Sequence, residues 1–78
     1  MSALQQAEQA YADAMMAEVE VAMRRARMKL QLRQCPELHG AIQPAIDQLG
    51  TILQERADAV AATKAAFEFH TERSRLTT

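Results

Sequence analysis

Gln34-Cys35-Pro36-Glu37-Leu38-His39-Gly40 is the stretch of this chain in which helix-breaking residues gather between two long helical patterns. Pro36 disfavours an α conformation in the residue before it and has no N–H of its own to donate. Gly40 can adopt a left-handed conformation at little cost. Pro44, a little further on, is tolerated mainly in a first helical turn. The stretch therefore predicts a turn over residues 34–43 that separates two helices.

The residues before the turn predict one uninterrupted helix from about Ala3 to about Arg33. Neither Gly nor Pro occurs in this segment, and good helix formers such as Ala, Gln, Glu, Met, Leu and Arg dominate it. Ser2 and Gln5 have the spacing of a capping box, in which each side chain bonds the backbone N–H of the other residue. We therefore expect the helix to begin directly after Ser2.

Apolar side chains of this first helix fall on two lines, both with the alternating steps of three and four residues that are typical of a coiled-coil seam. The first line consists of Ala12, Met16, Val19, Met23, Ala26 and Leu30. The second line, which Glu18 and Arg25 interrupt, consists of Leu4, Ala7, Tyr11, Ala14, Val21, Met28 and Leu32. At 100° per residue the two lines lie roughly 140° apart, so a single partner helix can hardly cover both.

The residues after the turn predict a second helix over about residues 44–72, followed by a frayed tail over 74–78. We expect the chain, residues 1–78, to form a single domain. The main apolar line of the second helix consists of Ile42, Ile46, Leu49, Leu53, Val60 and Phe67. A second line of mostly small side chains, which would let another helix approach closely, consists of Ala45, Ile52, Ala59 and Ala66.

Folding at the turn predicts an all-α structure, a hairpin of two long antiparallel helices whose main apolar lines face each other. The expected pairs are Leu30 with Ile46, Met23 with Leu53, and Met16 with Val60. The other two lines would then stay exposed, and such ridges usually mark association surfaces. The predicted partner-binding residues are Tyr11, Ala14, Val21, Met28, Leu32, Ala45, Ile52, Ala59 and Ala66. Because two helices alone bury little apolar area, we expect self-association or a protein partner to complete the core.

Charge, hydropathy and cysteine content argue against several classes of protein. The net charge of −1, from nine basic and ten acidic residues, argues against a general nucleic-acid binder, since such proteins usually carry a clear positive excess. The chain has no apolar run near 18 residues, which predicts no membrane span, and its N-terminus does not resemble a signal peptide. One cysteine cannot form an internal disulfide. A cytoplasmic location is therefore the default expectation.

Basic residues gather just before the turn, at Arg24, Arg25, Arg27, Lys29 and Arg33. Arg24, Arg25 and Lys29 are candidate contacts for an anionic partner. The alternative is a solvated helix face, because basic side chains also suit the negative end of a helix dipole.

The sequence carries no catalytic signature, so we expect no enzymatic activity and no cofactor. Cys35 and His39 provide only two of the three or four protein ligands that a zinc site normally needs, so we expect no metal site.

Several features together resemble a known family. They are the chain length, the end of the first helix at Arg25-Ala26-Arg27-Met28-Lys29-Leu30, a short turn with Pro36, and a second helix with Ile42, Ile46, Leu49 and Ile52. Over residues 10–68 this pattern resembles the small helical-hairpin co-chaperones of type III secretion needle subunits, the YscE, PscE and SsaE group. The resemblance implies a protein that helps a second, tetratricopeptide-like chaperone to hold a needle subunit monomeric in the cytosol.

These observations favour a small, non-enzymatic protein-binding module, a chaperone or adaptor that covers an apolar helix of its partner. Two alternatives remain open. One is a phage or mobile-element regulator that inhibits a host protein through the same helical surface. The other is a Rop-like helical dimer that binds RNA through Arg24, Arg25 and Lys29.

Overall fold

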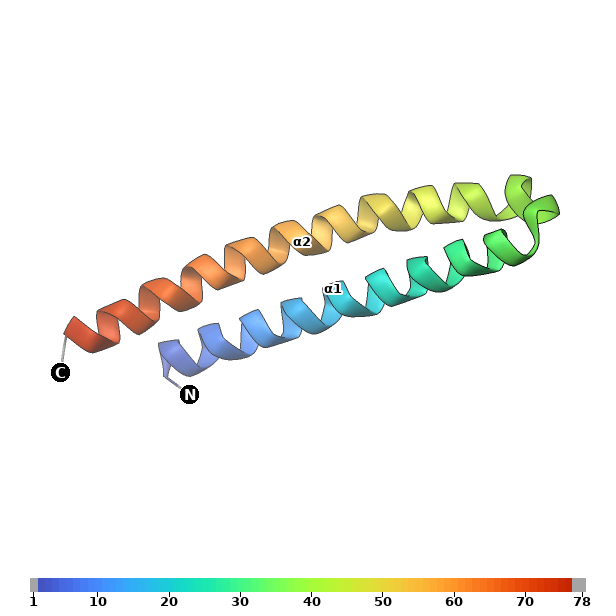
Figure 1. Ribbon diagram of the computed structural model, residues 1–78. Helices are drawn as coiled ribbons and strands as arrows, with labels where there is room; N and C mark the ends of the chain where they lie inside the picture. Colours follow the sequence, from blue (N-terminus) through green and yellow to red (C-terminus); the bar gives the residue numbers. More distant parts are fainter. Residues whose placement is uncertain (1, 77–78) are drawn as a thin grey trace.

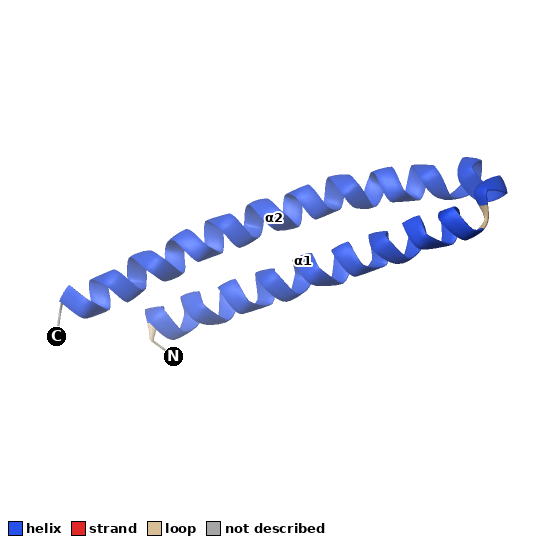
Figure 2. Cartoon of the chain, viewed as in Figure 1, coloured by secondary structure: helices blue, strands red, loops and turns tan. Residues whose placement is uncertain are grey.

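Two long helices account for nearly all of the structure. The computed structural model describes residues 2–76, and α1 (Ala3–Gln34) and α2 (His39–Leu76) run antiparallel in it as a hairpin (Figure 1). Loop structure is confined to the start of the chain and to the link between the helices (Figure 2). The all-α hairpin predicted from the sequence is therefore confirmed.

The predicted capping box opens α1. The Ser2 hydroxyl accepts a hydrogen bond from the Gln5 backbone N–H at 3.1 Å, and the Gln5 side chain accepts one from the Ser2 N–H at 3.0 Å. The two side-chain oxygens thus accept hydrogen bonds from backbone N–H groups that have no acceptor within the helix. The start of the first helix is thus set by its own sequence.

The turn is shorter than the expected residues 34–43. Cys35 leaves the helical conformation, with φ −130° and ψ 75°, and a 3₁₀ turn over Pro36–Leu38 leads directly into α2. Pro36 suffices for this break, because it excludes the α region for Cys35 and its own fixed φ suits the start of a new helical turn. Gly40 is already part of α2, and no residue among 2–76 has a positive φ.

α2 is longer than expected at both ends. Pro44 lies inside the helix and not in its first turn, so one backbone hydrogen bond, to the Gly40 carbonyl, cannot form there. At the other end residues 74–76 are helical where a frayed tail was expected; residues 77–78 of that tail lie outside the described part of the chain. The C-terminal end of α2 extends past the start of α1 (Figure 1).

The core between the helices is thin. The molecule measures 61 × 16 × 15 Å, and among residues 2–76 only Ile46 is fully buried, with 2% of its surface exposed. A side chain between two helices keeps at least one open flank, so most seam residues are only half-buried. Neither helix, within the described residues, has a stretch long and apolar enough to cross a lipid bilayer.

Candidate protein-binding surface

One face of α1 packs against α2 along its whole length. The rings of Tyr11 and Phe67 lie 5.8 Å apart between centroids and tilt by 32°, which is a favourable spacing for an aromatic pair. The half-buried apolar residues of α1 on this face include Leu4, Ala7, Tyr11, Ala14, Val21, Met28 and Leu32. The predicted main line of α2 lies opposite, with Ile46 buried and Ile42, Leu49, Leu53, Val60 and Phe67 half-buried.

Arg25 is accommodated in this seam although its charge interrupts the apolar line. Its Nε donates a hydrogen bond of 3.1 Å to the backbone carbonyl of Ile46. Gly50 makes the space for it, since a Cβ at that position would lie 3.2 Å from Arg25 Nη2. The pairing of a helical glycine with an arginine on the facing helix is the signal that the sequence interpretation missed.

The predicted roles of the two α1 lines are therefore reversed. The prediction that Leu30, Met23 and Met16 pack against α2 is wrong, because these side chains are 55%, 51% and 71% exposed. The residues of α1 that were predicted to form a free partner-binding surface instead lie half-buried against α2; they are Tyr11, Ala14, Val21, Met28 and Leu32. The line that Glu18 and Arg25 interrupt is therefore the one that packs on α2, and it carries Tyr11, the aromatic residue of α1.

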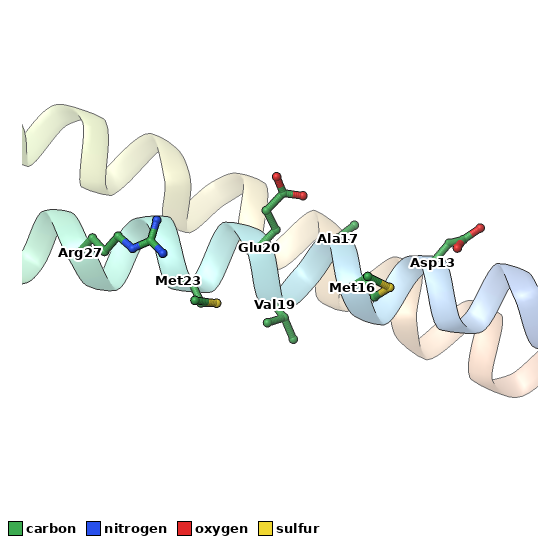
Figure 3. Close-up of a pocket in the computed structure, with 7 residues that line it drawn as sticks. All are labelled: Asp13, Met16, Ala17, Val19, Glu20, Met23 and Arg27. Carbon is green, nitrogen blue, oxygen red and sulfur yellow. The ribbon is translucent and has the colours of Figure 1, made fainter.

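The surplus apolar surface of α1 faces solvent. We call it the Met16–Leu30 stripe, and it consists of Met16, Val19, Met23, Ala26 and Leu30, all exposed. In Figure 3, Val19 and Met23 project from one side of the helix, while Glu20 and Asp13 project from the opposite edge. The shallow depression on this face is lined by residues of α1 alone, so it is part of a ridged helix surface and not an enclosed cavity.

The predicted binding line of α2 is a weaker surface. Ala45 and Ile52 are half-buried, whereas Ala59 and Ala66 are exposed. An alanine side chain offers one methyl group, so the exposed part of this line buries little area on its own. The Met16–Leu30 stripe is the larger apolar surface.

Charge is separated along α1. Residues 3–23 contain four acidic and no basic side chains, namely Glu8, Asp13, Glu18 and Glu20. Residues 24–34 contain five basic and no acidic side chains, namely Arg24, Arg25, Arg27, Lys29 and Arg33. This order suits the dipole of α1, and it also gives the exposed stripe one acidic end and one basic end.

The three predicted contacts for an anionic partner are not equivalent. Arg25 is half-buried and bonded to the Ile46 carbonyl, so it serves the hairpin itself. Arg24 and Lys29 are exposed. Within residues 2–76 no group of three or more His, Cys, Asp or Glu side chains is placed to hold a metal ion.

No family model, curated protein or solved structure matches this chain.

Proposed function

We propose that this protein is a small, non-enzymatic protein-binding module, a chaperone or adaptor of the cytoplasm that covers an apolar helix of a partner. The observation that carries the proposal is the Met16–Leu30 stripe. Met16, Val19, Met23 and Leu30 are each more than half exposed, and they follow the three- and four-residue spacing of a helix-docking seam. Leaving such a stripe in water forgoes the free energy of its burial.

The chemistry of the stripe fits a helical partner. It spans about 21 Å of helix axis, which is enough for three turns of a docking helix, and two of its five residues are methionines. Methionine is flexible and polarisable, so a methionine-rich face adapts to differing apolar partners. A role in type III secretion, or in a phage or mobile element, would use the same surface on a different partner.

Site-specific photo-crosslinking in the native host tests this proposal. A photoreactive amino acid in place of Val19, on the stripe, is expected to give a discrete adduct with another protein. The matched control carries the same amino acid in place of Ala61, which is exposed on α2, and is expected to give none. The proposal is wrong if neither position gives an adduct, or if both give the same one.

A Rop-like RNA-binding dimer is the second candidate, because residues 24–34 of α1 hold five basic and no acidic side chains. Arg24 and Lys29 are the exposed members that RNA phosphates could reach. Binding of this kind weakens steeply with added salt. A gel-shift assay with structured RNA at low salt checks it, and the absence of a shift there removes this candidate.

A further inference from the structure

The distribution of charge on α1 indicates which helix can lie on the Met16–Leu30 stripe. We propose that the stripe is occupied, in the free protein, by the same stripe of a second copy, and that the two α1 helices run antiparallel. This inference rests on the proposed function in one respect, namely that the stripe is a docking face for a helix.

The first argument is that the two halves of α1 carry opposite charges, which attract each other only when the two helices run antiparallel. Glu18 and Arg25 are half-buried toward α2 and take no part in this match. In a parallel pair the exposed acidic side chains of α1 would lie near their own copies, and so would its exposed basic side chains; these are Glu8, Asp13 and Glu20, and Arg24, Arg27, Lys29 and Arg33. Like charges held side by side are destabilising. An antiparallel pair places each acidic half beside a basic half, and a two-fold axis makes this match twice with one surface.

The second argument concerns the edge of the stripe. Asp13, Glu20 and Arg27 line the same depression as three residues of the stripe, Met16, Val19 and Met23. The three charged residues follow one another at seven-residue intervals, which keeps them on one edge. When the two-fold axis passes near Met23, Glu20 of one copy lies opposite Arg27 of the other, and the reverse holds too. The methionine at the centre then packs against its own copy.

The third argument is the thin core of the single hairpin. With Ile46 as the one fully buried side chain of residues 2–76, the hairpin has little apolar burial of its own. Pairing of the stripes would enclose the side chains that are more than half exposed on α1 and give a four-helix arrangement with a second seam. A foreign helix would then have to displace the second copy in order to bind.

Exchange of the edge charges tests the arrangement. Sedimentation equilibrium of the wild type is expected to show a reversible dimer of twice 8.7 kDa. Glu20→Arg and Arg27→Glu should each weaken the dimer about tenfold, because each replaces two attractive pairs by two repulsive ones. An equimolar mixture of the two variants should recover wild-type association as a heterodimer. Glu55→Arg, the same charge change at an exposed site on α2, should leave association unchanged.

Disulfide trapping gives a second measurement that does not depend on repulsion. In a Cys35→Ala background, Met23→Cys should form a disulfide-linked dimer under mild oxidation, since residue 23 of each protomer lies near the two-fold axis and therefore near its counterpart. Met16→Cys should not, because its copy lies about 20 Å away at the other end of the stripe. A parallel pair would link at both positions. Circular dichroism confirms that each variant retains its helix content before it is scored.

The outcomes separate this inference from the proposed function. A wild type that stays at 8.7 kDa at every concentration overturns the inference, and so does a dimer that the mixed variants fail to restore or that Met16→Cys links. If the protein is monomeric but crosslinks to a foreign protein from position 19, the proposed function stands and the second copy is excluded. If it is monomeric and gives no adduct, both fall.

Discussion

At the scale of single residues, the hairpin depends on a few pairs across one seam. Arg25 reaches the Ile46 carbonyl because Gly50 has no side chain to block it. Tyr11 meets Phe67 near the open end of the hairpin. Both contacts join residues that are far apart in sequence, so they set the register and the rotation of α1 on α2.

The two glycines give a matched comparison. Gly40→Ala should raise the free energy of unfolding by about 0.5–1 kcal/mol, since alanine is the better helix former and a Cβ there meets nothing within 4 Å. Gly50→Ala should gain less, because its Cβ would lie 3.2 Å from Arg25 Nη2. Urea unfolding followed by circular dichroism measures both changes. Equal gains would show that Arg25 does not press on Gly50.

The two phenylalanines of α2 give a second matched comparison, because Phe67 pairs with Tyr11 and Phe69 does not. Phe67→Ala should lower the free energy of unfolding by about 2–3 kcal/mol, because it removes half-buried apolar area and the ring contact with Tyr11. Phe69→Ala, which removes an identical side chain that is 59% exposed, should change it by less than about 0.5 kcal/mol. Thermal unfolding of the two variants at one protein concentration checks the order, and equal losses would contradict the seam.

At the scale of the elements, α1 has two apolar faces and the fold uses one of them. Length, helix formers and the break at Pro36 sufficed to predict both helices and their antiparallel order. The choice of face could not be predicted by counting apolar residues, since it was decided by where Arg25 and Tyr11 find partners on α2. A charged residue within a seam is tolerated when a glycine lies opposite, and periodicity alone does not reveal that.

Val21 and Val19 test the choice of face with one residue type. Val21→Asp places a carboxylate in the half-buried seam and should destabilise the hairpin by about 2 kcal/mol or more. Val19→Asp acts on a side chain that is 54% exposed, so the helix content should remain while association through the stripe is lost. Circular dichroism and sedimentation distinguish the two effects. A Val21→Asp protein as stable as Val19→Asp would refute the observed packing.

At the scale of the whole molecule, a thin core makes stability depend on association. A species that binds only the folded state raises its stability by mass action. The midpoint of thermal unfolding should therefore rise with protein concentration for the wild type. It should stay constant for Val19→Asp, which is expected to be monomeric. Scanning calorimetry over a dilution series measures this, and a wild-type midpoint independent of concentration would indicate a self-sufficient hairpin.

The link between the helices has a consequence for engineering. The start of α1 and the end of α2 lie toward one end of the 61 Å rod, and the 3₁₀ turn Pro36–Leu38 forms the other end (Figure 1). Tags or fluorophores attached at both chain ends would therefore crowd together, whereas a label on Cys35 would report from the distant tip. In the antiparallel dimer with its axis near Met23, the tips point in opposite directions but lie only roughly 36 Å apart along the helix axis, so two tip labels would still be close enough for energy transfer.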